Sequence, residues 1–343
     1  MPSSPNATTS LRPGEAALNT LAALVQDDLE ACNRTIVARM ESPVALIPAL
    51  AAHIVAAGGK RLRPLLTLAA ARLCGYGAAV GETRHVQLAA CVEFIHTATL
   101  LHDDVVDESA LRRGLASANA VFGNKASVLV GDFLFARAFQ LMVEDGSLRV
   151  LAILSQAAAT IAEGEVLQLI TQNDLATDEA RYLDVIRGKT AALFAAACQV
   201  GAVVAGRETR FETALAQFGL NLGIAFQLVD DALDYAADQA QLGKTIGDDF
   251  REGKTTLPVL LAYHAGDAEE RAFWERTIAR SEQTPEDLPQ AIALIERHQG
   301  IEATLARAGR FAEAARHALA GFPPSPLRDA LHEAAEYTLH RAR

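Results

Sequence analysis

Residues 88–107 read LAACVEFIHTATLLHDDVVD, and this stretch decides the fold class. From Leu88 to Leu101 the apolar residues fall nearly all round a helix, which is typical of a helix inside a large bundle. Residues 191–205 have the same character. Ala, Leu and Glu dominate the other segments, and alternating Val, Ile and Thr runs of strand type are absent. The sequence therefore predicts an all-α fold of about a dozen helices in one large bundle, with its site in a central apolar cavity.

Composition excludes several classes of protein. The chain has 343 residues, 50% of them hydrophobic, and its formal net charge is −11 from 42 acidic and 31 basic residues. A chain this rich in apolar residues is not disordered as a whole. Its acidity argues against nucleic acid as a partner, because nucleic-acid binders present a basic surface.

The N-terminal segment and the apolar runs indicate where in the cell the protein is expected. Residues 1–14 are rich in Ser, Thr and Pro and lack the apolar run of a signal peptide, so we expect a disordered tail there and a single domain over residues 15–343. The longest apolar run, residues 191–206, is too short to span a membrane. We therefore expect a cytoplasmic protein without a transmembrane segment. Its four scattered cysteines are expected as buried thiols: Cys32, Cys74, Cys91 and Cys198.

The chemistry begins where the opening stretch ends. Asp103, Asp104 and Asp107 form a D-D-x-x-D motif, which places Asp103 and Asp107 one helical turn apart on one face. Carboxylates beside an apolar helix need a partner, and ligands that are all oxygen favour Mg²⁺. For one such motif alone, a solvated acidic helix end is an equally good interpretation.

A second copy of the motif favours a metal site over a solvated helix end. Asp230, Asp231 and Asp234 belong to another apolar helical run, residues 218–235. If the two helices face each other, the two carboxylate clusters hold a group of Mg²⁺ ions between them. Mg²⁺ shares its coordination between a few carboxylates and substrate phosphates. The pair of motifs therefore predicts a phosphorylated substrate between them.

Basic residues agree with a phosphorylated substrate. Residues 58–64 read GGKRLRP, residues 112–114 read RRG, and residues 243–255 read GKTIGDDFREGKT. Glycine lets a backbone approach a phosphate closely, and arginine binds its oxygens bidentately. Each segment alone is typical of a solvated surface, but together with two metal-type motifs they favour diphosphate binding. His96 lies seven residues before Asp103, and for it a core position and a phosphate-binding role are equally good interpretations.

Taken in order, these segments resemble the trans-polyprenyl diphosphate synthases. The resemblance covers residues 58–258, and more loosely the rest of the chain to the C-terminus. Residues 93–108 and 127–132 are most similar to the bacterial octaprenyl diphosphate synthases, which make the ubiquinone or menaquinone side chain. The resemblance implies a homodimeric prenyltransferase with the isoprenoid-synthase type of bundle. The matching segments are GGKRLRP, EFIHTATLLHDDVVD, RRG, KT, FQLVDDALD and GKTIGDDFREGK.

The resemblance also implies roles for individual residues. The substrates would be isopentenyl diphosphate and an allylic diphosphate such as farnesyl diphosphate. The cofactor would be Mg²⁺, three ions once diphosphate is bound, with Mn²⁺ as a substitute. The implied metal ligands are Asp103, Asp107, Asp230 and Asp234. The implied catalytic set adds Asp104, Asp231, Arg112 and Lys189. Isopentenyl diphosphate would be held by Lys60, Arg63, His96 and Arg113, and the allylic diphosphate by Arg112, Lys189, Thr190, Gln227, Lys244 and Lys254.

Product length is expected to depend on the residues just before the first motif. Thr99 and Ala98, four and five residues before Asp103, are both small. In the resembled family, bulky aromatic residues at these places stop growth at short products. A 20-residue helix is roughly 30 Å long, so an unblocked groove beside it holds many isoprene units. This favours a long product, with Phe135, Phe139 or Met142 as candidate plugs. Ordinary core packing is an equally good interpretation of these three residues.

Other interpretations of the same motifs remain. A related synthase could make another product, namely geranylgeranyl, heptaprenyl, solanesyl or decaprenyl diphosphate. A class I terpene cyclase shares the first motif, but it usually has an N-S-E type second motif and lacks an isopentenyl diphosphate site. A non-catalytic subunit would have lost Asp or Arg residues from the motifs, and none is lost here.

For a polyprenyl diphosphate synthase, we expect the product to pass to a membrane enzyme.

Overall fold

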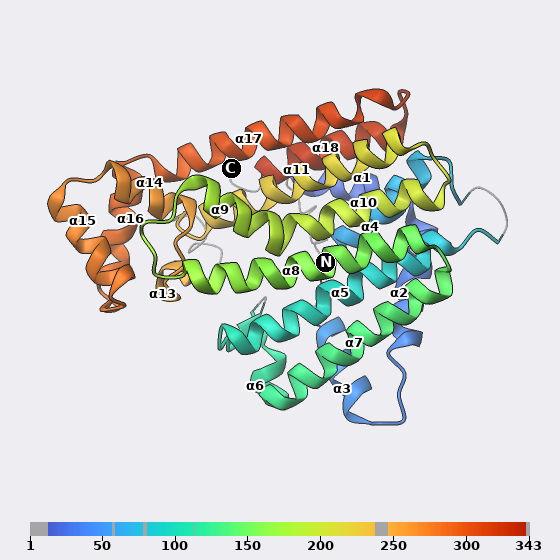
Figure 1. Cartoon of the computed structure of the whole chain (residues 1–343), viewed down its shortest axis with the longest axis horizontal. Helices are drawn as coiled ribbons and strands as arrows, with labels where there is room; N and C mark the ends of the chain where they lie inside the picture. The colour runs from blue at the N-terminus through green and yellow to red at the C-terminus, as the bar shows by residue number, and fades with distance from the viewer. Residues whose placement is uncertain (1–12, 57–58, 78–80, 113, 237–245, 341–343) are drawn as a thin grey trace, which may run out of the picture.

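The computed structural model describes residues 13–56, 59–77, 81–112, 114–236 and 246–340. Long helices run side by side along the longest axis of the molecule, as Figure 1 shows. The first half contains α1 (Pro13–Leu24), α2 (Gln26–Arg39), α3 (Leu46–Ala56), α4 (Leu62–Leu73), α5 (Arg84–Val106), α6 (Ala118–Phe122), α7 (Asn124–Asp145) and α8 (Leu148–Thr171). The second half contains α9 (Glu179–Ile186), α10 (Ala192–Val204), α11 (Thr209–Leu233), α13 (Asp248–Arg251), α14 (Leu257–Ala265), α15 (Ala268–Trp274), α16 (Asp287–Arg297), α17 (Gly300–Ala318) and α18 (Pro326–His340).

The opening stretch forms the centre of the bundle, as predicted. Helix α5 packs against α2, α4, α7 and α10, and α10 packs in turn against α4, α8 and α11. Most of the α5 side chains from Leu88 to Leu101 are buried, because neighbouring helices cover that helix on several sides. Helix α17 covers α11, and the end of α5 and the end of α11 carry the two aspartate motifs.

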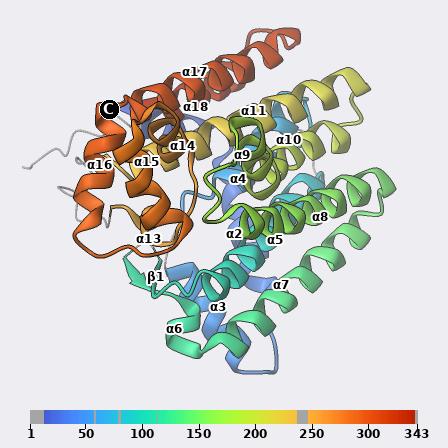
Figure 2. The same ribbon diagram turned by 60° about the vertical axis from the view of Figure 1, so that its left-hand side comes forward.

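A smaller apolar cluster lies at one end of the molecule. Figure 2 brings that end forward, with α13, α15 and α16 grouped together. Trp274 is fully buried there and packs its ring edge-on against Phe250 and Phe273. This cluster supports the segment that follows the second aspartate motif.

The structure departs from the predicted pattern in two local elements. A two-stranded antiparallel hairpin, β1 (Leu111–Arg112) and β2 (Leu115–Ala116), follows the first motif, although no strand was expected. Gly114 has a φ of 79° there, a conformation that glycine adopts without strain. The second element is a π-helical turn over Arg187–Ala191 between α9 and α10. The described residues also contain more helices than expected, because several are a few residues long.

Three expectations about the chain as a whole have different outcomes. All four cysteines are free and buried, as predicted. Helix α1 begins at Pro13, two residues before the predicted domain boundary, because proline suits the first position of a helix. By length and composition α7 and α8 could each cross a membrane. In the most apolar stretch of each helix, 44% of α7 and 28% of α8 is buried. Core helices of soluble bundles pass the same test, so this is weak evidence for a membrane span.

Candidate active site

The first aspartate motif ends helix α5. The backbone N–H of Asp107 donates to the carbonyl oxygen of Asp103 at 2.7 Å, so these two residues lie one turn apart as predicted. Burial, together with the nearby carboxylates of Glu165 and Asp107, raises the pKa of Asp103 to about 7, although Lys189 and Arg112 lower it. The carboxyl of Asp103 therefore lies in a place that favours a bound cation.

Asp104 has a different environment from its neighbours. It is 2% exposed, and the Nε atom of Arg112 donates to its two carboxylate oxygens at 2.8 and 3.0 Å. Its backbone carbonyl accepts from the side-chain amide of Asn119 at 2.9 Å. Asp104 thus ties the hairpin to α5 and holds Arg112, which was predicted to bind the allylic diphosphate.

The second aspartate motif ends helix α11. Asp234 caps that helix, and its carboxylate accepts from the backbone N–H groups of Asp248 and Asp249 at 3.2 and 3.0 Å. Burial raises the pKa of Asp234 to about 6, against these two hydrogen bonds, which lower it. Burial likewise raises the pKa of Asp231 to about 6. Several carboxyls are therefore crowded at this end of α11.

Lys254 connects the two motifs. Its Nζ atom lies 3.4 Å from Oδ2 of Asp107, and it also pairs with Glu252. Burial lowers the pKa of Lys254, but the carboxylates of Asp249 and Asp107 outweigh burial and raise it. Since Asp249 donates its backbone N–H to Asp234, the lysine shows that both motifs border the same space.

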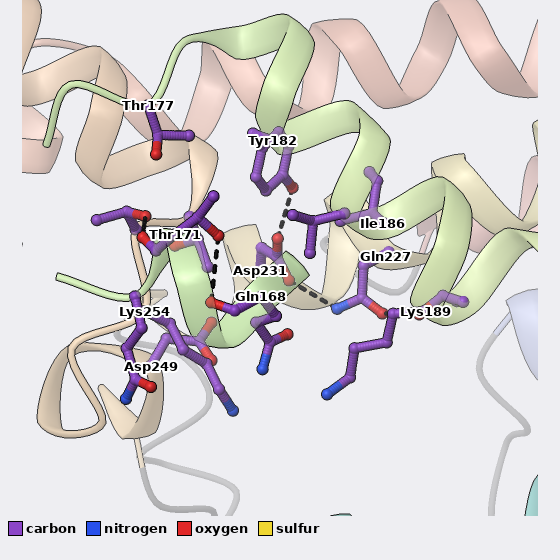
Figure 3. Close-up of a pocket in the computed structure, with 15 residues that line it drawn as sticks. Gln168, Thr171, Thr177, Tyr182, Ile186, Lys189, Gln227, Asp231, Asp249 and Lys254 are labelled. Carbon is purple, nitrogen blue, oxygen red and sulfur yellow. Dashed lines mark hydrogen bonds between the residues drawn. The ribbon is translucent and has the colours of Figure 1, made fainter. Parts of the chain in front are cut away.

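A pocket of about 100 Å³ lies at this place, bordered by α8, α9, the π-helical turn, α11 and the segment after α13. Figure 3 shows Tyr182 above Asp231, with Gln227 beside it and Lys189 below. The walls are a mixture of polar and apolar side chains. The lining residues include five of the predicted site residues, namely Lys189, Thr190, Gln227, Asp231 and Lys254.

The π-helical turn positions two of these predicted residues. Lys189 pairs with Glu165 of α8 at 2.8 Å, and Thr190 donates to Gln227 at 2.8 Å. The turn lies directly against α8 at a pair of glycines: a Cβ atom on Gly164 would lie 2.4 Å from the backbone nitrogen of Lys189. π-Helical turns are frequent at functional sites. The small residue at position 164 thus allows the turn to reach the pocket.

The residues predicted for isopentenyl diphosphate lie at the start of α4 and on α5. Arg63 and His96 are in contact at 3.0 Å, and the Arg63 guanidinium stacks over the ring of Phe194 at 4.5 Å. Lys60 instead contacts Tyr337 of α18, with its Nζ atom 5.0 Å from the ring centre. The structure therefore brings Arg63 and His96 together and places Lys60 against the C-terminal helix. Arg113 and Lys244 lie outside the described residues.

The two residues predicted to control product length differ in exposure. Ala98 is fully buried in the main core, while Thr99 is half-buried and donates its hydroxyl to the carbonyl of His96 at 2.8 Å. Among the candidate plugs, Met142 is buried, but Phe139 is 47% exposed on α7. Phe139 therefore does not close an interior path for the product tail in this structure.

Several residues that contact the predicted site residues were not identified from the sequence. None of them belongs to a motif: they are Tyr182, Glu165, Gly164 and Tyr337. Tyr182 precedes Lys189 by seven residues, which gave no signal because the π-helical turn between them was not expected.

The donor set fits a hard divalent cation that also binds phosphate. Within the described ranges, no three Asp, Glu, His or Cys side chains form a group that would hold a metal by themselves. Mg²⁺ takes only one or two carboxylates at many sites and completes its shell with water and phosphate. The carboxyls of Asp103 and Asp234 have raised pKa values and lie close to other carboxylates, which matches that requirement.

Comparisons with known proteins identify the family. A family model described as polyprenyl synthetase matches residues 44–295. Octaprenyl diphosphate synthase of Escherichia coli K12 is 48% identical over 320 residues, which cover 93% of this chain and 98% of the relative. A polyprenyl synthase from Caulobacter crescentus CB15, solved with calcium and isoprenyl diphosphate, is 54% identical with a TM-score of 0.91, covering 95% of this chain and 98% of that one. A decaprenyl diphosphate synthase from Rhodobacter capsulatus is 54% identical with a TM-score of 0.90, covering 95% and 99%. The chain belongs to the polyprenyl synthetase family.

Proposed function

We propose that this chain is an all-trans-octaprenyl diphosphate synthase, which adds isopentenyl diphosphate units head-to-tail to farnesyl diphosphate. The observation that carries the proposal is a pocket lined by Lys189, Lys254 and Asp231 of the second motif, in which Lys254 also contacts Asp107 of the first motif. Relatives with 44–48% identity that are named octaprenyl diphosphate synthases support the substrate class.

The reaction follows from where the charges lie. The allylic diphosphate binds between the motifs, with Lys189 and Lys254 against its oxygens. The bond between C1 and the diphosphate oxygen breaks, and both electrons leave with the diphosphate. The alkene of isopentenyl diphosphate then attacks C1, and the proton lost from C2 of that unit passes to the released diphosphate. The product is an allylic diphosphate five carbons longer, which re-enters the cycle.

Mg²⁺ is the proposed cofactor, held by Asp103 and Asp107 on one side and by Asp230 and Asp234 on the other. When bound, it supplies positive charge that stabilises diphosphate as a leaving group. Two related structures solved with calcium and isoprenyl diphosphate support the use of a divalent cation. Arg63 and His96, which contact each other, are proposed to hold isopentenyl diphosphate together with Lys60 and Arg113.

The proposed product length rests on the helix before the first motif. Thr99 and Ala98 leave no bulky side chain beside the motif, so the growing tail passes along α5 toward α7. The alternative product is decaprenyl diphosphate, because a decaprenyl diphosphate synthase from Rhodobacter capsulatus is 54% identical to this chain. We propose that the product supplies a quinone side chain, that the enzyme is cytoplasmic and that it hands its product to a membrane enzyme.

A homodimer is proposed because α7 and α8 leave apolar side chains uncovered. Leu129, Val143, Leu148 and Ile170 are 65–82% exposed. Leu129 and Val143 are fourteen residues apart, about four turns, so they lie on one face of α7. A second copy of the chain would remove this apolar surface from water.

The elongation reaction can be tested directly. Purified protein is freed of metal with EDTA and incubated with labelled isopentenyl diphosphate and farnesyl diphosphate, with and without added Mg²⁺. We expect labelled product only when Mg²⁺ is present. Equal elongation without any divalent cation would contradict the proposed role of the aspartate motifs. Rates with geranyl, farnesyl and geranylgeranyl diphosphate would identify the preferred primer.

A further inference from the structure

A series of hydrogen bonds runs through the wall of the pocket. The Tyr182 hydroxyl donates to Oδ2 of Asp231 at 2.5 Å, and the Gln227 amide nitrogen donates to Oδ1 of Asp231 at 2.7 Å. The Thr190 hydroxyl donates to Oε1 of Gln227 at 2.8 Å. Figure 3 shows the two bonds to Asp231. The four residues come from α9, the π-helical turn and α11, so the series fixes these elements relative to one another.

The series has a definite direction. Both oxygens of Asp231 accept, so Gln227 turns its NH₂ group to the carboxylate and its carbonyl to Thr190. The single hydroxyl hydrogen of Thr190 is then used on Gln227, and its remaining lone pairs are left for the pocket that Thr190 lines. With the amide reversed, Thr190 would present a hydrogen atom to the pocket.

This direction matters for the proposed reaction, on which the inference rests. Positive charge develops at C1 of the allylic substrate as the diphosphate leaves. An oxygen lone pair oriented beforehand toward that position stabilises the charge without reorganisation, while an O–H hydrogen would oppose it. The bonds lie in a dry environment, since Tyr182, Thr190 and Asp231 are 4–6% exposed. Hydrogen bonds are electrostatically stronger in such surroundings.

We propose that Tyr182 is a positioning residue for carbocation formation. Its hydroxyl holds Asp231 as an acceptor, Asp231 fixes the orientation of the Gln227 amide, and Gln227 directs the Thr190 oxygen lone pairs into the pocket. Tyr182 acts through these partners and does not touch the reacting atoms.

The test is a double-mutant cycle between Tyr182→Phe and Thr190→Val, read as single-turnover rate constants with farnesyl and isopentenyl diphosphate. We expect Tyr182→Phe to slow the single-turnover step about tenfold, with its amplitude and the affinity for both diphosphates unchanged. In the Thr190→Val background, Tyr182→Phe should change the rate by less than twofold, because its effect passes through Thr190. Tyr76→Phe, between α4 and α5 with its ring against His85, is the matched control and should retain the wild-type rate.

The outcomes separate the two proposals. The positioning role is wrong if Tyr182→Phe has the wild-type single-turnover rate constant. It is also wrong if Tyr182→Phe and Thr190→Val lower that rate constant independently, each by the same factor with or without the other. A fall in amplitude with an unchanged rate constant would show that Tyr182 only maintains the fold, which also overturns it. If the wild-type protein elongates no primer, it is the proposed function that fails.

Discussion

The middle aspartates of the two motifs have contacts that set them apart from the outer ones. The carboxylate of Asp104 accepts a hydrogen bond from Arg112, and that of Asp231 accepts hydrogen bonds from Tyr182 and Gln227. Asp107 and Asp103 instead lie near lysines, and Asp103 carries a raised pKa. At the residue scale, the middle aspartate of each motif organises its surroundings, and the outer pair is proposed to hold the metal.

Asp103→Asn should have opposite effects on stability and activity. The unfolded carboxyl ionises near pH 3.8 and the folded one near pH 7, so wild-type stability falls as pH rises through this range. The amide removes that loss. We expect Asp103→Asn to melt at a higher temperature than the wild type at pH 8 in EDTA and to differ little at pH 4. Its kcat with Mg²⁺ should fall on the order of 100-fold or more. A lower melting temperature at pH 8 in EDTA would contradict the burial argument.

At the element scale, the interior position of α5 could be predicted, because apolar residues all round a helix leave no face for water. The facing of the two motifs was inferred from their repetition. The hairpin at Leu111–Ala116 and the π-helical turn at Arg187–Ala191 could not be predicted. Each depends on a contact with another element: Asp104 of α5 holds Arg112, and Gly164 of α8 makes room for Lys189. The role of Tyr182 was hidden for the same reason.

Gly164→Ala tests how the π-helical turn is positioned. The added Cβ would lie 2.4 Å from the backbone nitrogen of Lys189, so the turn must move. A displacement of about 1 Å at a site can cost on the order of 100-fold in rate. We expect a large loss of kcat and a melting temperature several degrees lower. Gly309→Ala on α17 is the matched control, since no atom lies within 4 Å of its Cβ, and it should be neutral or stabilising.

Thr99→Phe tests the path of the growing chain along α5. A bulky ring four residues before Asp103 should block the tail, so the product becomes shorter while the first condensation continues. Thr99→Ser keeps the small volume and the hydroxyl bond to His96, and should leave product length unchanged. Products are dephosphorylated and sized by chromatography. An unchanged product with Thr99→Phe would refute this path.

At the scale of the whole molecule, acidity and an anionic substrate are compatible. The net charge of −11 includes the carboxylates of both aspartate motifs, and Lys254 of the pocket contacts Asp107 of the first. A bound divalent cation would convert that region from repelling diphosphate to attracting it. The exclusion of nucleic acid from composition is unaffected by this argument and remains a prediction.

The apolar faces of α7 and α8 lead to a prediction about assembly. We expect the wild-type chain to have twice the 36.5 kDa chain mass in light scattering. The double variant Leu129→Glu, Val143→Glu should shift toward the single-chain mass. Leu24→Glu, at a 40% exposed leucine on α1, should remain a dimer. A wild-type mass of one chain would contradict the proposed homodimer.

The central claim is that this chain builds a long all-trans polyprenyl diphosphate at the meeting of its two aspartate motifs. The most direct test incubates the purified protein with Mg²⁺, farnesyl diphosphate and an excess of labelled isopentenyl diphosphate, and sizes the dephosphorylated product. Addition of five units to the primer, giving the octaprenyl chain, is the predicted result. A product of decaprenyl length would correct only the chain length, whereas no elongation with any allylic primer would contradict the whole account.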